Sequence, residues 1–506
     1  MKKYLVSILL IVVIAFGFVA CAQKDNVLDS RAPEGAGGVR IDSGEISAVE
    51  PSGIPSGEIP HFDGSTSEAI GYIRDGGTVK YLDGGYVVYR KDGSVAGALT
   101  DEEAREVIQA RAGMLTACAY DDHGSIDYWK GLLTSTQEGP GKYAEYYQLF
   151  AFKALHQVKV TAQGLPQATI LLKDGDVVLF AAKTDNAGVG YLYAPEWKEG
   201  LQVELVLPQD FDQASLRKEA QAEVVFDQDE IGGEAGDRAQ NVELMFVIDT
   251  TGSMGDEIDY LKKEIADVIA RVKEATQAEV TLALMVYRDE GDEYVTLYSD
   301  FTKDIDAQKA WLEKQHAGGG GDFEEAVETA LSEAVSKQWS AKCDKYIVHV
   351  ADAPAHDKKV NEWDEAILDA ARAGIKVLTV ASSGIDQKTE YFFRSQSLLT
   401  GGVYVYLTDD SGIGGCHLEA DVEERPKVEY LNDCLVRLIS VLHEGRATDA
   451  VIQLPADKTV EVEPGQEQEP KEEAPDEGKG DDEQPTSPED EGKTEEKAGE
   501  TEEIEG

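Results

Sequence analysis

One apolar run, which ends in three oxygen-bearing side chains, most constrains what this chain can fold into. The segment Asn241 to Met254 has the sequence NVELMFVIDTTGSM. Within it, Leu244 to Ile248 have the length and β-branched content of a strand buried on both faces, as in a parallel sheet. The turn that follows carries Asp249, Thr251 and Ser253 at alternate positions. Open α/β sheets bind ligands beyond the carboxyl ends of their strands, and such oxygens suit a hard cation, so this turn is a candidate divalent-cation site.

This turn and three later stretches resemble the von Willebrand factor type A (vWA) family, whose metal-ion-dependent adhesion site begins with a D-x-S-x-S turn. Gly318 to Ala326, GGGGDFEEA, resembles the family's second metal loop, and Val348 to His356, VHVADAPAH, resembles the third. Met285 to Asp292, MVYRDEGD, is similar to a branch found in extracellular proteins and in some kinase-linked forms. The resemblance covers roughly Asn241 to His443 and implies a cation-dependent binding domain.

The resemblance also implies a ligand set. Thr251 and Ser253 would bind the metal through their hydroxyls, Asp249 mainly through water, and Asp352 would complete the site. The family's second loop usually offers a threonine, whereas this chain presents Asp322 after its glycine run. A carboxylate bound directly there would cancel more of the ion's charge and weaken its pull on an acidic partner group. The expected cofactor is Mg²⁺, or else Mn²⁺ or Ca²⁺.

Each of these features also has a simpler interpretation. Asp249 or Ser253 could cap the helix that follows the turn. The glycine run could be a flexible turn, or could expose backbone amides to a phosphate, although it lacks the lysine of a P-loop. The acidic tip Asp289 to Glu293 could be solvated surface rather than a source of further ligands.

Alternating strand and helix patterns around these loops predict a doubly wound, mainly parallel α/β sheet over 239–455. Strands are expected at 280–287, 295–298, 346–351, 375–381 and 402–407, and helices at 255–276, 307–314, 324–335, 361–373 and 430–443.

Upstream of this domain, short strand-like runs over 157–208 predict a small β-sandwich module. Its stretch Lys183 to Pro195, KTDNAGVGYLYAP, resembles the T-D-x-x-G turn of carboxypeptidase-regulatory-like and related immunoglobulin-like modules, which are usually spacers. An α+β region of unknown role is expected at 65–156, with hairpins over 78–98, a helix from Thr100 to Ala112 and mainly helical structure from Tyr120 to Gln157. Residues 209–238 are expected to form an acidic linker.

The amino terminus predicts export. Two lysines precede the apolar run Leu5 to Val19, and about fifteen apolar residues suit a signal peptide rather than a membrane-spanning helix. The end of this run, followed by Ala20 and Cys21, resembles a bacterial lipobox, which implies a signal peptide over 1–20 and an acylated Cys21. Ala22, directly after the cysteine, resembles the sorting signal of outer-membrane lipoproteins if the host is Gram-negative. The alternative is an ordinary secretory signal, with Cys21 free or in a disulfide.

The two flanks are expected to be flexible. Residues 21–64 are rich in Gly, Ser, Pro and acidic residues and predict a tether, and residues 456–506 predict a disordered acidic tail. The formal net charge of −51 makes nucleic acid a poor partner. We expect protein partners that offer an acidic side chain to the metal or a basic surface to the tail, and membrane attachment through the lipid.

The sequence thus favours a non-enzymatic, lipid-anchored protein of the bacterial cell envelope that mediates adhesion or another protein–protein interaction. One alternative is a structural scaffold in which the metal only stabilises the loops. A metal-dependent hydrolase is less favoured, because G-x-S-x-G and H-E-x-x-H motifs are missing and His356 is the only suggestive base.

Overall fold

The computed structural model describes residues 40–41, 69, 78–82, 85–90, 94–99, 112–134, 140–209, 211–232, 236–411, 413–446 and 452–454. One compact unit covers Met1–Thr459, and the second, Val460–Gly506, lies outside the described residues. The predicted signal peptide, Cys21, the acidic tail and most of the tether also lie outside them, as does nearly all of the helix predicted to end at Ala112. Among the described residues, no helix is both long and apolar enough to cross a bilayer.

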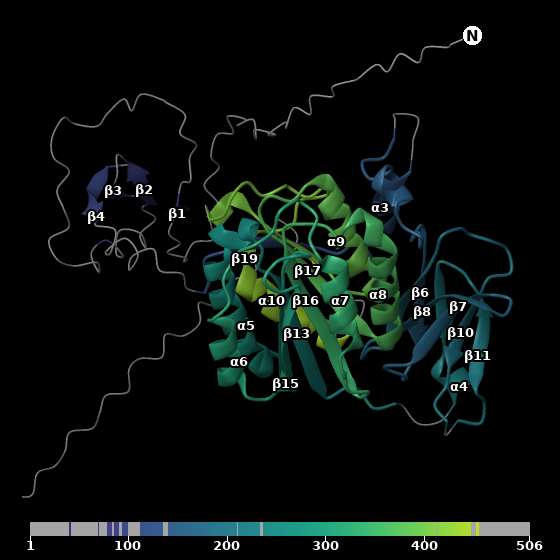
Figure 1. Cartoon of the computed structure of the whole chain (residues 1–506). Coiled ribbons are helices and arrows are strands. Elements are labelled where there is room, and N and C mark those ends of the chain that lie inside the picture. The colour runs from purple at the N-terminus through teal and green to yellow at the C-terminus, as the bar shows by residue number, and fades with distance from the viewer. Residues whose placement is uncertain are drawn as a thin grey trace, which may run out of the picture. The chain divides into compact units, whose positions relative to one another are not determined.

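An eight-stranded sheet forms the centre of the structure, in the order β15-β14-β13-β16-β17-β18-β5-β19 (Figure 1). Neighbouring strands from β14 to β18 are parallel, whereas β15, β5 and β19 pair antiparallel to their neighbours. The predicted doubly wound, mainly parallel α/β fold is therefore confirmed. The strands are β5 (Thr116–Tyr120), β13 (Asn241–Asp249), β14 (Glu279–Tyr287), β15 (Thr296–Thr302), β16 (Cys343–Ala351), β17 (Ile375–Ala381), β18 (Tyr404–Leu407) and β19 (Glu429–Tyr430).

Helices cover both faces of this sheet, because its strands are apolar on both sides (Figure 1). In β13, Leu244 and Phe246 belong to one core, while Met245 and Val247 belong to the core on the opposite face. The first core is covered by α5 (Ile258–Thr276), α6 (Ile305–Leu312) and α10 (Leu431–Glu444), and the second by α7 (Val327–Ser336), α8 (Val360–Ala373) and α9 (Gln387–Thr400).

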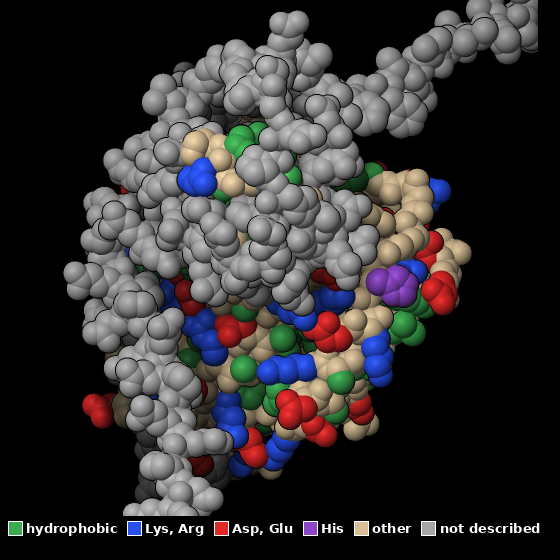
Figure 2. All heavy atoms as spheres, turned by 90° about the vertical axis from the view of Figure 1, so that its left-hand side faces the viewer, with side chains coloured by type: hydrophobic (Ala, Val, Ile, Leu, Met, Phe, Trp, Pro, Cys, Tyr) green, Lys and Arg blue, Asp and Glu red, His purple; other side chains and the backbone are tan. Residues whose placement is uncertain are grey.

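The outer surfaces of these helices mix charges of both signs. Lys263 of α5 pairs with Glu313 at 2.7 Å, and Arg271 pairs with Asp433 of α10 at 2.7 Å. On the face shown in Figure 2, blue Lys and Arg side chains lie beside red Asp and Glu side chains.

Strand β5 comes from a segment that the sequence placed in a separate region, 65–156. It pairs with β18 in the central sheet, with Tyr120 opposite Tyr404. Glu264 of α5 fixes the approach to β5, because its carboxylate accepts the backbone amide hydrogens of Met114 at 2.8 Å and Leu115 at 2.9 Å. The central sheet therefore includes a strand from outside the predicted 239–455 domain.

The segment after β5 is less helical than predicted. It contains α3 (Ile126–Leu133) and the short 3-10 helix η1 (Tyr146–Gln148). Its aromatic side chains pack against α9, where Trp129 stacks on Tyr391 at 5.8 Å between ring centroids. Trp129 and Tyr143 are fully buried and belong to the hydrophobic core on this side of the sheet.

The predicted β-sandwich is present but longer than expected, since two strands fall within the predicted acidic linker 209–238. Its two sheets have the orders β11-β10-β7-β8 and β12-β6-β9. The resemblance to carboxypeptidase-regulatory-like modules remains a prediction. The strands are β6 (His156–Ala162), β7 (Thr169–Asp174), β8 (Val177–Lys183), β9 (Val189–Ala194), β10 (Gln202–Val206), β11 (Ser215–Glu219) and β12 (Glu223–Phe226), and α4 (Gln228–Ile231) follows them.

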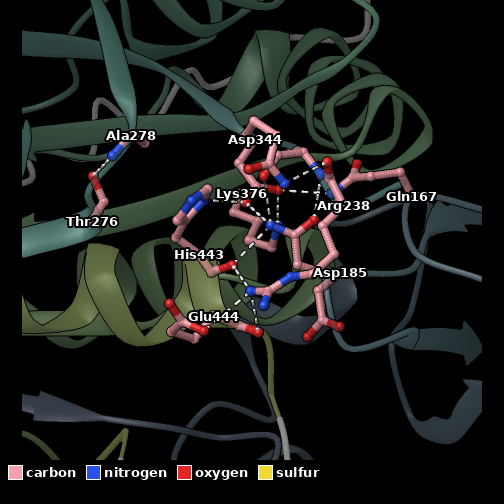
Figure 3. A network of polar contacts seen from close by, with 12 residues as sticks. Gln167, Asp185, Arg238, Thr276, Ala278, Asp344, Lys376, His443 and Glu444 are labelled. Atoms are coloured by element: carbon pink, nitrogen blue, oxygen red, sulfur yellow. Dashed lines mark hydrogen bonds and ion pairs between the residues drawn. The ribbon is translucent and has the colours of Figure 1, made fainter. Parts of the chain in front are cut away.

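A buried polar network joins the sandwich to the central sheet (Figure 3). The Asp344 carboxylate, at the start of β16, accepts hydrogen bonds from Gln167 at 2.7 Å and Asn186 at 2.8 Å. His443 of α10 contacts the same carboxylate at 2.7 Å. Because the side chain of Asp344 is fully buried, these contacts hold the sandwich in one position, which differs from a loosely attached spacer.

Farther upstream, the hairpins predicted over 78–98 are present as a small sheet. Strands β2 (Thr78–Leu82), β3 (Gly85–Tyr89) and β4 (Val95–Leu99) pair antiparallel. Strand β1 (Arg40–Ile41), which falls within the predicted tether, pairs parallel with β2.

Candidate divalent-cation site

The predicted first metal loop lies at the carboxyl end of β13. Asp249 is fully buried, and its Oδ1 accepts hydrogen bonds from the Thr251 backbone amide at 2.8 Å and the Thr251 hydroxyl at 2.7 Å. The Thr251 hydroxyl lies 3.2 Å from the Ser253 hydroxyl. A 3-10 turn, η2 (Gly252–Asp256), separates this loop from α5. Asp249 therefore shapes the loop itself and does not cap α5.

The third loop brings Asp352 to the same place, because β16 lies beside β13 in the sheet. Asp352 is 4 % exposed and follows the last residue of β16. Burial and the neighbouring charge of Asp249 raise the pKa of Asp352, while the Ser253 hydroxyl partly opposes the rise. Burial likewise raises the pKa of Asp249. The structure therefore brings Asp249, Ser253 and Asp352 together.

The glycine run docks directly on the first loop. The Gly318 amide donates to the Thr250 carbonyl at 3.0 Å, and the Gly252 amide donates to the Gly319 carbonyl at 3.2 Å. Gly319 has a φ of +81°, and a Cβ there would lie 2.3 Å from an Asp292 carboxylate oxygen. Glycine is therefore required at this position, and the run is an ordered part of the site.

The acidic hairpin also contacts this region. Asp292 accepts the Gly320 amide hydrogen at 2.8 Å, and Arg288 donates from Nε to the Thr250 carbonyl at 3.2 Å. Asp289 is buried, whereas Glu290 and Glu293 are exposed. The interpretation of this hairpin as a solvated tip therefore holds only for its outer residues.

The second loop places its acidic residues differently from the prediction. Asp322 is exposed, and within the described residues no hydrogen bond links it to Asp249, Ser253 or Asp352. Glu325, three positions later, is 3 % exposed, and its amide donates to the Pro354 carbonyl in the third loop at 3.1 Å. The sequence did not single out Glu325, because nothing in GGGGDFEEA distinguishes its three acidic residues.

His356 lies between two carboxylates. Its Nε2 is 3.1 Å from Asp289 and its Nδ1 is 3.3 Å from Glu328. Glu328 is fully buried and also pairs with Lys359 at 3.1 Å. Because both ring nitrogens already have acidic partners, this histidine is poorly placed to serve as a general base for a bound substrate.

The donor set can be tested against a cation. Four carboxylate oxygens are buried without a hydrogen-bond partner in this part of the structure, namely Asp249 Oδ2, Asp289 Oδ1, Glu325 Oε2 and Asp352 Oδ1. Of these, Asp289 Oδ1 lies 3.1 Å from His356 Nε2. A buried anionic oxygen is costly unless a cation or a proton compensates it. Carboxylate and hydroxyl oxygens are the ligands that Mg²⁺, Mn²⁺ and Ca²⁺ prefer, so the residues present fit such an ion. No group of three or more His, Cys, Asp or Glu side chains in the described regions is already spaced to hold a metal, so hydroxyls or water would have to contribute.

The part of the chain that carries this site is similar to known proteins. The von Willebrand factor A domain family model matches residues 243–415. Over 184 residues, the chain is 27 % identical to an ariadne-like RING finger protein of Acanthamoeba polyphaga mimivirus, a match that covers 33 % of this chain and 18 % of that protein. Over 172 residues, it is 23 % identical to alpha-protein kinase vwkA of Dictyostelium discoideum, which covers 33 % of this chain and 27 % of the kinase. The chain thus spans about a quarter or less of these curated relatives.

Two solved structures align with parts of this chain. An aerotolerance-related membrane protein of Bacteroides fragilis is 17 % identical with a TM-score of 0.25, over 34 % of this chain and 94 % of that chain. A von Willebrand factor type A structure from Catenulispora acidiphila is 13 % identical with a TM-score of 0.29, over 58 % of this chain and 51 % of that chain. The family match spans strands β13 to β18 of the central sheet, so residues 243–415 have a von Willebrand factor A-like α/β fold.

Proposed function

We propose that this chain is a lipid-anchored protein of the bacterial cell envelope whose vWA domain binds one divalent cation and uses that face to bind protein partners. The cation would be held by Thr251, Ser253 and Asp352, with Asp249 acting mainly through water. Domains of the vWA family generally mediate protein interactions, and this supports a binding role. The partner and the anchor are part of the proposal.

The observation that carries the proposal is the set of buried carboxylate oxygens without partners. Asp249 and Asp352 come from neighbouring strand ends, and each keeps one such oxygen. Two carboxylates in one site raise each other's pKa, as Asp352 shows. A bound Mg²⁺, Mn²⁺ or Ca²⁺ would supply the positive charge that this cluster lacks.

A binding role fits the surroundings of the site better than hydrolysis does. His356 is already engaged by Asp289 and Glu328 on its two ring nitrogens. The exposed Phe323, at 45 % exposure beside the glycine run, offers an apolar contact next to the site. Aromatic side chains at the rim of a polar site are frequent anchors in protein interfaces.

Calorimetric titration of the full chain with Mg²⁺, Mn²⁺ and Ca²⁺ tests the cation site. We expect saturable binding of one ion, lost in Asp249→Ala and kept in Asp259→Ala, whose carboxylate is 74 % exposed on α5. Equal affinities in wild type and Asp249→Ala would contradict the proposal.

The lipid anchor needs its own test, because Cys21 lies outside the described residues. Cells that express the full chain are fed an alkyne-labelled fatty acid. We expect label in the wild type and none in Cys21→Ser, which should leave the membrane fraction. Retention of label in Cys21→Ser would show that this cysteine is not the acylated residue.

A further inference from the structure

We infer that Glu325 binds the cation directly and completes the site from within the chain, so that the face accepts a neutral or basic partner group rather than a carboxylate. This inference rests on the cation-binding function proposed above. It assigns the second-loop ligand to a residue that the family pattern does not indicate.

Contacts from two loops place Glu325 at the site. Its amide hydrogen bonds to the Pro354 carbonyl at 3.1 Å, which ties it to the loop that carries Asp352. From the other side, a Cβ built on Gly320 would lie 3.1 Å from Glu325 Oε1 and 3.5 Å from Thr251 Cβ. Gly320 therefore lies between the Glu325 carboxylate and Thr251 of the first loop. Because it has no side chain, the carboxylate can lie close to that loop.

The Glu325 carboxylate is buried without a positive partner. Glu325 is 3 % exposed, its Oε2 makes no hydrogen bond, and no Lys, Arg or His forms an ion pair with it in the described structure. The acidic groups that act on it most strongly are Asp249, Asp289 and Asp352. All the named charges around it are negative, so a cation is the ligand that would relieve this cluster.

Asp322 lacks these properties. It is exposed, and its charge adds to burial in raising the pKa of Asp289 in the hairpin. An exposed carboxylate keeps its hydration and loses little free energy without a metal. Asp322 therefore serves as a matched control for Glu325, since both lie in the same loop.

The charge balance defines the partner. With Asp249, Asp352 and Glu325 all ionised, a divalent cation leaves the cluster with a net negative charge. The nearby Lys359 and Lys388 do not offset this, because Lys359 pairs with Glu290 and Glu328, and Lys388 pairs with Glu324 and Asp357. A partner carboxylate would thus be repelled and would also have to displace Glu325, whereas an amide, hydroxyl or basic group would not be repelled.

The test uses the full chain with Mn²⁺ as the probe and compares wild type, Glu325→Gln and Asp322→Asn by calorimetry. We expect Glu325→Gln to weaken Mn²⁺ binding by at least about tenfold, because it removes a charged ligand. Asp322→Asn should change the affinity by less than about twofold. Thermal unfolding without metal gives a second measure: Glu325→Gln should melt at the same or a higher temperature, since it removes one acidic group from a buried cluster of carboxylates.

A rescue experiment tests whether the Glu325 carboxylate occupies a ligand position of the cation. In Glu325→Ala, added acetate should restore part of the Mn²⁺ affinity by occupying the vacated position, and it should not affect the wild type. If wild type binds Mn²⁺ but Glu325→Gln binds equally well, or if Asp322→Asn causes the loss, the inference is overturned while the proposed cation site stands. If the wild type itself binds no Mn²⁺, the proposed function fails and the inference fails with it.

Discussion

The side-chain amide of Asn186 donates a 2.8 Å hydrogen bond to the buried carboxylate of Asp344, and so links the β-sandwich to the vWA sheet. The same amide donates to the His443 carbonyl at 2.8 Å, and Asn186 Oδ1 accepts from the Ala239 backbone at 2.8 Å. One side chain thus contacts β16, α10 and the residues just before β13. The sandwich and the domain should consequently behave as one body.

We expect Asn186→Ala to lower the free energy of unfolding by about 3 kcal/mol, because it leaves the buried Ala239 amide without its acceptor and removes one of the hydrogen bonds to the buried Asp344 carboxylate. Urea unfolding of the full chain measures the change. Gln213→Ala, at an exposed position, is the control and should change stability by less than about 0.5 kcal/mol. If Asn186→Ala changed stability as little as the control does, the contacts of Asn186 between the sandwich and the central sheet would contribute little to the free energy of unfolding.

Asp122→Ala should destabilise the protein by about 3 kcal/mol, because it leaves Arg394 of α9 buried without its main counter-charge. Arg394 is fully buried, and its Nε donates to Asp122 Oδ2 at 3.0 Å. Asp127→Ala is the matched control, since that carboxylate is 94 % exposed. Chemical unfolding measures both variants, and equal stabilities would contradict a structural role for this pair.

Removal of β5 should prevent the vWA domain from folding as a soluble unit. A fragment over 239–455 lacks β5 and exposes the edge of β18, whose four residues are all buried in the structure. We expect this fragment to aggregate in size-exclusion chromatography, and a fragment over 112–455 to unfold cooperatively. A monomeric, cooperatively unfolding 239–455 fragment would contradict the assignment of β5 to this domain.

The stability contributed by His417 should depend on pH. Its Nδ1 lies 2.8 Å from Asp409 and its Nε2 lies 3.0 Å from Glu257. Burial disfavours the charged ring, but these two carboxylates outweigh burial and raise its pKa to about 9. Because the folded-state pKa lies above the unfolded value, the stabilisation is complete below about pH 6.5 and is lost as the pH rises through about 9.

Comparison of wild type with His417→Gln in urea from pH 6 to 9.5 checks this expectation. The difference in unfolding free energy should be largest near pH 6, at about 3 kcal/mol, and should shrink toward pH 9.5. A difference that stays constant over this range would show that the ring charge is not involved.

Apolar patterning predicted most of the sheet and five of its helices, because the central strands are short continuous apolar runs and the helices carry apolar stripes. It missed α9, in which every residue from Thr389 to Thr400 is buried, so that no apolar stripe stands out. It also missed the place of β5. The short run TACAY does not indicate which strand it pairs with, and its partner Tyr404 lies almost 300 residues after Tyr120 in the sequence.

The candidate site was predicted unevenly for a similar reason. Asp249, Ser253 and Asp352 lie at strand ends, and parallel strands bring such ends together. Glu325 lies in a loop whose path depends on the positive φ of Gly319 and Gly320 and on the Pro354 contact. Burial of one acidic residue among three neighbours is a tertiary effect that local sequence does not encode.

The central claim is tested most directly by anomalous difference density from crystals of the full chain grown with Mn²⁺. The account predicts one strong peak enclosed by Asp249, Ser253 and Asp352, which disappears in Asp249→Ala crystals. Peaks confined to the exposed acidic surface, with the three loops ordered and this position empty at saturating Mn²⁺, would contradict it.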